Sequence, residues 1–77
     1  MLLFDLFAYN NSFLLISPSG TIYTEGIFYA DIECIFMGSE YFVISTFNDK
    51  HYYINKNEET DQLIKAYHEW EKKHDGY

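Results

Sequence analysis

The chain of 77 residues contains no arginine, one cysteine, one proline and four glycines. The single cysteine, Cys34, excludes an internal disulfide framework and favours a reducing compartment over an oxidising one. Arginine is the side chain best suited to bidentate contacts with phosphate and guanine, and here twelve acidic residues face only five lysines, for a net charge of −7. The sequence therefore predicts no direct binding of DNA or RNA.

Targeting signals and chemical motifs are also missing. Residues 1–16 are largely apolar, but they carry no positive charge, and Asp5, Asn10 and Asn11 interrupt them. We therefore expect no membrane partner and a cytoplasmic location. The sequence contains no phosphate-binding glycine loop, nucleophile elbow or paired-carboxylate arrangement, so we expect a protein that is not an enzyme and that binds no cofactor.

Aromatic side chains, in contrast, are abundant. Eight Tyr, seven Phe and one Trp make up 21% of the chain. Large rings bury much area per residue, which allows a small chain to form a core without disulfides. We therefore expect residues 1–77 to form a single domain.

Turn-forming residues divide the first two thirds of the chain into short β-branched and aromatic runs. Asn10–Asn11 and Gly38–Ser39 are each predicted to form a tight hairpin turn. Because short turns join successive strands, we predict an α+β fold with an antiparallel meander sheet of about five or six strands over residues 2–55. The expected strands cover residues 2–9, 12–17, 21–24, 27–36, 41–47 and 51–55.

The run 27–36 has the clearest alternation of apolar and polar residues. A helix over 29–37 that ends at Gly38 is the alternative interpretation, but the acidic residues fit a strand better. The strand interpretation places Phe28, Ala30, Ile32, Cys34 and Phe36 on the apolar face, and Tyr29, Asp31 and Glu33 on the polar face.

The first two expected strands, 2–9 and 12–17, are apolar on both faces. Such strands either lie in the centre of the sheet or have their second face covered by another layer. In a domain with one helix, a second subunit is a candidate for that layer, so a homodimer is possible.

The character of the sequence changes at Asn57, a favourable N-cap residue. Acidic side chains follow it, Lys72 and Lys73 precede the predicted end, and Gly76 comes after it. These signals predict a helix over about residues 58–74, packed across one face of the sheet.

Two groups of residues invite a chemical interpretation, and neither supports one. His68 and His74 lie six positions apart, which places them about 120° apart around a helix, so we expect no metal site. Cys34 and His51 are candidates for a Cys–His dyad. Because Cys34 lies on the apolar face of its expected strand, we expect an inert core thiol instead.

What remains is a surface of acidic residues interleaved with tyrosines. Aromatic residues are favoured anchors in protein interfaces, although each tyrosine alone is more typical of a half-buried sheet position and each acid alone of a solvated face. As a set they predict a partner-binding surface. The candidate residues are Tyr29, Asp31, Glu33, Glu40, Tyr41, Tyr52, Tyr53, Glu58, Glu59 and Asp61.

Two functional hypotheses follow. The first is a small acidic inhibitor whose carboxylates replace phosphates in the basic nucleic-acid channel of a protein or nucleoprotein complex. In size and charge the chain is similar to phage inhibitors of defence nucleases, anti-CRISPR proteins among them. Its many residues with AT-rich codons favour a low-GC bacterium or a phage, and the host cytoplasm as its location. The second hypothesis is a self-associating, homodimeric structural or accessory protein.

Overall fold

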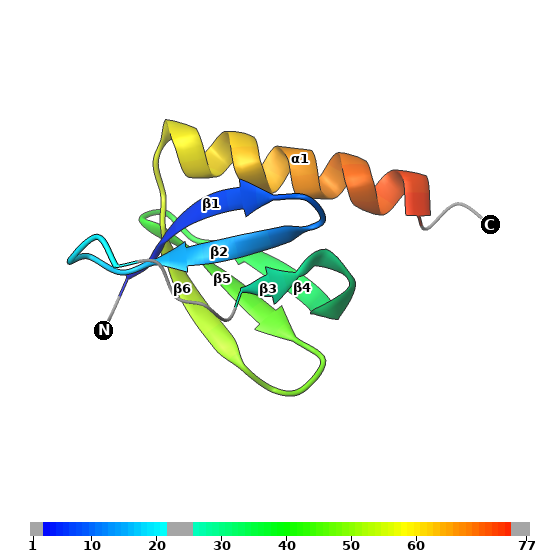
Figure 1. The fold of residues 1–77 in the computed structure, drawn as a ribbon, viewed down its shortest axis with the longest axis horizontal. Coiled ribbons are helices and arrows are strands. Elements are labelled where there is room, and N and C mark those ends of the chain that lie inside the picture. The colour runs from blue at the N-terminus through cyan, green and yellow to red at the C-terminus, as the bar shows by residue number, and fades with distance from the viewer. Residues whose placement is uncertain (1–2, 22–25, 75–77) are drawn as a thin grey trace.

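The computed structural model describes residues 3–21 and 26–74. Within these residues it shows six strands followed by one helix, which confirms the α+β class (Figure 1). The elements are β1 (Asp5–Tyr9), β2 (Ser12–Ile16), β3 (Ile27–Phe28), a 3-10 turn (Tyr29–Asp31), β4 (Ile32–Met37), β5 (Tyr41–Thr46), β6 (His51–Asn55) and α1 (Glu58–His74).

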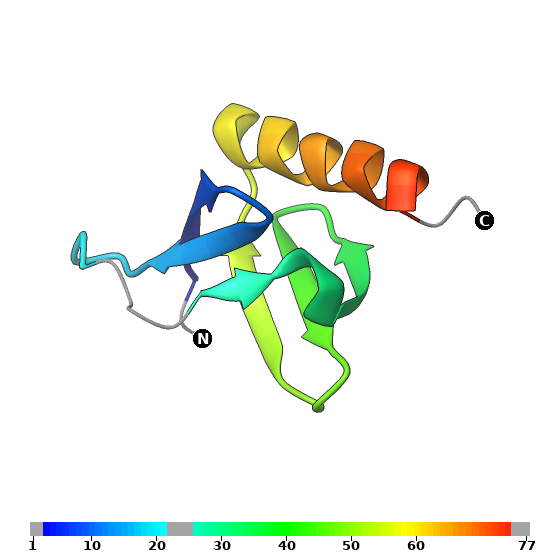
Figure 2. The same cartoon turned by 45° about the vertical axis from the view of Figure 1, so that its right-hand side comes forward.

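The strands form two antiparallel sheets of three strands each, in the orders β1-β2-β3 and β4-β5-β6. Each sheet is a meander, as predicted, but the single continuous sheet is divided between β3 and β4. Figure 2 shows the two sheets inclined to each other, with α1 extending across both. The expected strand 21–24 falls, apart from Thr21, outside the described residues.

The division lies within the run 27–36, where the predicted alternation is wrong. Tyr29 is buried instead of solvated, while Phe28 and Phe36 are each 63% exposed. The ring of Tyr29 fills the core, with its centroid 4.8 Å from that of Phe13 and 5.3 Å from that of Tyr67. The 3-10 turn that points this ring inward redirects the chain, so the residues before and after it join different sheets. The alternative helix over 29–37 is also wrong, because β4 occupies most of that range.

Phe4 connects the two sheets, because its backbone pairs with that of β6. Its N–H donates to the carbonyl of Tyr53 at 2.8 Å, and its carbonyl accepts from the N–H of Asn55 at 2.8 Å. The sheets therefore surround one common core, to which α1 contributes Ile64 and Tyr67. The buried hydrophobic residues are Leu6, Phe13, Leu15, Ile27, Tyr29, Ile32, Phe42, Ile44, Ile54, Ile64 and Tyr67.

Of the two predicted hairpin turns, the first forms as expected and the second is longer than expected. A two-residue turn joins β1 to β2, and Asn10 adopts the left-handed conformation, with φ of 53°. The predicted two-residue turn at Gly38–Ser39 is instead a three-residue loop. Glycine is needed there because a Cβ atom on Gly38 would lie 2.7 Å from the carbonyl oxygen of Tyr41.

The helix has the predicted bounds, and its first turn shows why. The side-chain oxygen of Asn57 accepts from the N–H of Thr60 at 3.0 Å, and the Thr60 hydroxyl oxygen accepts from the N–H of Asn57 at 2.9 Å. This reciprocal cap satisfies two donors. Beyond the cap, α1 runs beside β1 and packs against it (Figure 1). No helix within the described ranges is both long and apolar enough to cross a membrane.

Candidate protein-binding site

Three distant segments that carry acidic residues come together where β6 ends and α1 begins. Asp5, at the start of β1, accepts hydrogen bonds from the side-chain amides of Asn55 at 3.4 Å and Asn57 at 3.5 Å. The loop before β5 joins the same region, because the N–H of Lys56 donates to the carbonyl of Glu40 at 3.4 Å. We call this region the acidic end, which comprises Asp5, Glu40, Glu58, Glu59 and Asp61.

The acidic end is open to solvent and has two tyrosines beside it. All its members are exposed except the half-buried Asp5. Tyr41 follows Glu40 directly, and its ring meets that of Tyr53 edge-on, with the centroids 5.7 Å apart. Lys56 lies within this region. Its Nζ donates to the carbonyl of Gly38 at 3.3 Å, so the ammonium group is held by the protein's own backbone.

Six of the ten predicted partner-binding residues therefore lie together, and four do not. Tyr29 is 5% exposed and Tyr52 packs against the core, so neither presents a free ring to a partner. Asp31 and Glu33 are exposed, but they lie near the opposite end of β5 from Glu40, about 20 Å away by the rise of a strand. The sequence alternation that placed Tyr29 beside these acids fails at the 3-10 turn.

Asp5 is the member of the acidic end that sequence reasoning missed. Nothing near Asp5 in the sequence indicates a partner-binding role. It reaches the helix only because Phe4 pairs with the backbone of β6. Knowledge of the pairing between the first and last strands would have found it.

A second exposed surface covers the outer side of the β1-β2-β3 sheet. Phe7, Tyr9 and Phe28 are 51%, 59% and 63% exposed, and the register places Phe7 opposite the half-buried Leu14. We call this surface, with Ile16, the outer face. Strands β1 and β2 are apolar on both faces, and one of these faces packs in the core while the other is exposed to solvent.

The histidine and cysteine candidates show no catalytic arrangement. Cys34 and His51 lie on either side of Ser45 in the β4-β5-β6 sheet, which places their backbones about 10 Å apart. The Ser45 hydroxyl lies 2.8 Å from Nδ1 of His51. Ser45 is buried, and no described side chain orients the second ring nitrogen of His51 through a hydrogen bond. The described residues also contain no group of three or more His, Cys, Asp or Glu side chains that could hold a metal ion.

Among the ionisable groups of the described residues, two buried tyrosines have a raised pKa. Burial, and secondarily the neighbouring Glu71 carboxylate, raises the pKa of Tyr67 to about 12. The Tyr67 hydroxyl donates to Glu71 at 3.2 Å. Burial also raises the pKa of Tyr29. Both phenols therefore remain protonated at neutral pH and act as hydrogen-bond donors or core groups.

Comparisons of the chain with protein-family models, with curated proteins and with solved structures found no match. Any functional argument therefore depends on the chemistry of these surfaces.

Proposed function

We propose that the protein is a non-enzymatic inhibitor that binds a basic protein or nucleoprotein complex through its acidic end. The observation that supports this most strongly is that the fold brings together three separate segments that carry acidic residues, beside the paired rings of Tyr41 and Tyr53. Carboxylates oriented outward in this way attract a basic surface over long range, and the tyrosines supply contact area at low cost in conformational entropy.

The finer proposal is that the target surface normally binds nucleic acid. A channel lined by Lys and Arg for phosphates is equally complementary to clustered carboxylates. The absence of arginine and the net charge of −7 support an acidic protein that binds a basic surface in place of nucleic acid. The small size and AT-biased composition support a phage protein that acts against a bacterial defence complex in the host cytoplasm, as anti-CRISPR proteins do.

Affinity capture from a lysate of a low-GC bacterium tests this function, with bound proteins eluted in rising salt and identified by mass spectrometry. The test variant is E58Q/E59Q/D61N, which neutralises three carboxylates of the acidic end. The matched control is D31N/E33Q/D49N, which makes the same change of charge at exposed positions elsewhere. We expect a basic nucleic-acid-binding complex to be captured by the wild type and the control but not by the test variant.

Competition by nucleic acid makes the test specific. A polynucleotide added to the purified complex is expected to displace the protein, because both occupy the same basic surface. Capture that is equal for both triple variants, or that resists the polynucleotide, would contradict the proposal.

The outer face supports a second candidate function, self-association. Three large rings that are each more than half exposed on one side of a three-stranded sheet form an apolar patch of the kind found at protein interfaces. A second copy placed on this sheet would make the homodimeric accessory protein of the alternative hypothesis.

A further inference from the structure

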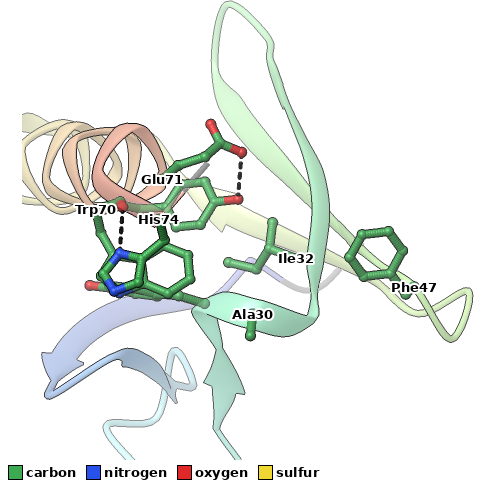
Figure 3. Close-up of a pocket in the computed structure, with 8 residues that line it drawn as sticks. Ala30, Ile32, Phe47, Trp70, Glu71 and His74 are labelled. Carbon is green, nitrogen blue, oxygen red and sulfur yellow. Dashed lines mark hydrogen bonds between the residues drawn. The ribbon is translucent and has the colours of Figure 1, made fainter. Parts of the chain in front are cut away.

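A hollow of about 580 Å³ lies between the second half of α1 and the segment that leads into β4. Its volume is within the usual range for ligand-binding pockets. Tyr67, Trp70 and His74 line it from the helix, while Tyr29 lines it from the 3-10 turn and Phe47 from the turn after β5. Figure 3 shows Phe47 on the far side of the hollow from Trp70 and His74. The hollow is therefore bordered by aromatic rings from the helix and from two turns.

The rings are held in place by one another. His74 stacks on Trp70, with centroids 4.3 Å apart and planes at 21°, and Tyr29 meets Trp70 edge-on at 5.3 Å. Phe47 forms no ring contact with another described residue and is 67% exposed. The hollow thus has one rigid wall and one exposed ring that faces solvent.

Among the described residues that line this hollow, Glu71 is the one carboxylate, and it remains available to a ligand. Its side chain is 47% exposed, one carboxylate oxygen accepts from Tyr67, and the other lies 3.6 Å from Nδ1 of His68. A carboxylate has about four acceptor positions, so these two contacts leave some of them free. None of the described residues that line the hollow is a lysine.

We propose that this hollow receives an arginine side chain of the basic partner, with the guanidinium group against the aromatic wall and paired with Glu71. The inference rests on the proposed function, since that function supplies a basic partner. A planar cation satisfies both features of the site, because guanidinium stacks on aromatic rings and forms paired hydrogen bonds with a carboxylate. An anion would be repelled by Glu71, and an apolar side chain would desolvate that carboxylate without compensation.

The chain contains one tryptophan, so the hollow has its own spectroscopic reporter. The probe is the peptide acetyl-Gly-Arg-Gly-amide, titrated into the ¹⁵N-labelled protein while the single indole N–H signal of Trp70 is followed by NMR. Peptides with lysine or norleucine in place of arginine are the comparison ligands. We expect the arginine peptide to shift the signal in a saturable manner at millimolar concentration, and the comparison peptides to bind at least fivefold more weakly. An equal response to either comparison peptide, or no response to arginine, would overturn the assignment.

Glu71→Gln is the decisive variant, because glutamine keeps the size and an acceptor for Tyr67 but removes the charge. The matched control is Glu69→Gln, an exposed position on the same helix that does not line the hollow. We expect E71Q to weaken arginine-peptide binding about tenfold and E69Q to change it less than twofold. Equal effects of the two substitutions would show that only the overall charge matters.

The acidic-end variant separates this inference from the proposed function. E58Q/E59Q/D61N leaves the hollow intact and should bind the arginine peptide as the wild type does. If the peptide does not bind but that variant still abolishes partner capture, the hollow assignment alone fails. If the peptide binds as predicted but no basic partner depends on the acidic end, the proposed function alone fails.

Discussion

The Asp5 carboxylate accepts a hydrogen bond from the side-chain amide of Asn55, 50 residues later, at 3.4 Å. This contact joins the first strand to the end of the last one, immediately before the helix. Together with the contact between Asp5 and the side-chain amide of Asn57, it places a carboxylate from the N-terminal segment at the start of α1. The acidic end is therefore a product of the tertiary fold, and variants that disturb the fold here must be distinguished from variants that remove charge alone.

Thr60 is expected to be the polar residue on which the helix start depends most. Its buried hydroxyl donates to the carbonyl of Asn55 at 2.7 Å and also accepts from the N–H of Asn57. Thr60→Val keeps the shape and removes these bonds, so it should lower the free energy of unfolding by about 1–3 kcal/mol. Chemical denaturation measures this loss. The exposed Gln62→Ala serves as control, and a loss no larger for Thr60→Val than for the control would contradict this role.

Gly38 is expected to be intolerant of any side chain. A Cβ atom there would meet the backbone carbonyl oxygen of Tyr41 at 2.7 Å, and a backbone atom cannot rotate away. Gly38→Ala should therefore cost about 1–3 kcal/mol, while the adjacent Ser39→Ala should have little effect. Thermal unfolding of both variants tests this difference. Equal melting temperatures would mean that the loop relaxes freely.

Stability is expected to fall at high pH because of Tyr67. Its pKa is raised to about 12 in the folded state from an ordinary value of 10. The folded protein therefore holds the phenolic proton more tightly than the unfolded chain. The resulting contribution to the free energy of unfolding is fully present below pH 10 and is lost as the pH rises through 12. Denaturation between pH 9 and pH 12 should show a steeper decline for the wild type than for Tyr67→Phe, which has no phenol to titrate. Parallel curves would contradict the assignment.

Self-association through the outer face predicts a dimer that depends on concentration and resists salt. The double variant Phe7→Ser/Phe28→Ser removes two exposed rings without touching the core, so it should abolish the dimer and leave the melting temperature of the monomer nearly unchanged. Analytical ultracentrifugation at 0.1–1 mM protein provides the measurement. A wild-type protein that remains monomeric over this range would exclude self-association as its function.

Local sequence signals were enough to predict the helix. The division of the strands into two sheets depends on tertiary packing, which those signals do not contain. The N-cap at Asn57 and the acidic first turn involve neighbours in sequence, so the bounds of α1 were predictable. The turn at Tyr29 depends on contacts with Phe13 and with Tyr67 in the helix, which no alternation of residues 27–36 encodes. For the same reason the single predicted sheet became two.

The candidate site shows the same division. Glu58, Glu59 and Asp61 were predictable because they share one helical turn. The aromatic hollow was not, since Phe47 and Trp70 come from segments whose proximity only the fold establishes. Asp5 was not predictable either, because it is placed by the parallel pairing of Phe4 with Ile54, which is a long-range contact.

The central claim is that the acidic end recognises a basic surface, and the salt dependence of that affinity tests it most directly. The affinity for the captured partner should be measured by calorimetry at 50 mM and 250 mM NaCl, for the wild type and for both triple variants. We predict that salt weakens wild-type binding at least tenfold, that E58Q/E59Q/D61N binds weakly with a much smaller salt effect, and that D31N/E33Q/D49N stays close to the wild type. A salt-insensitive affinity that both triple variants share with the wild type would contradict the account.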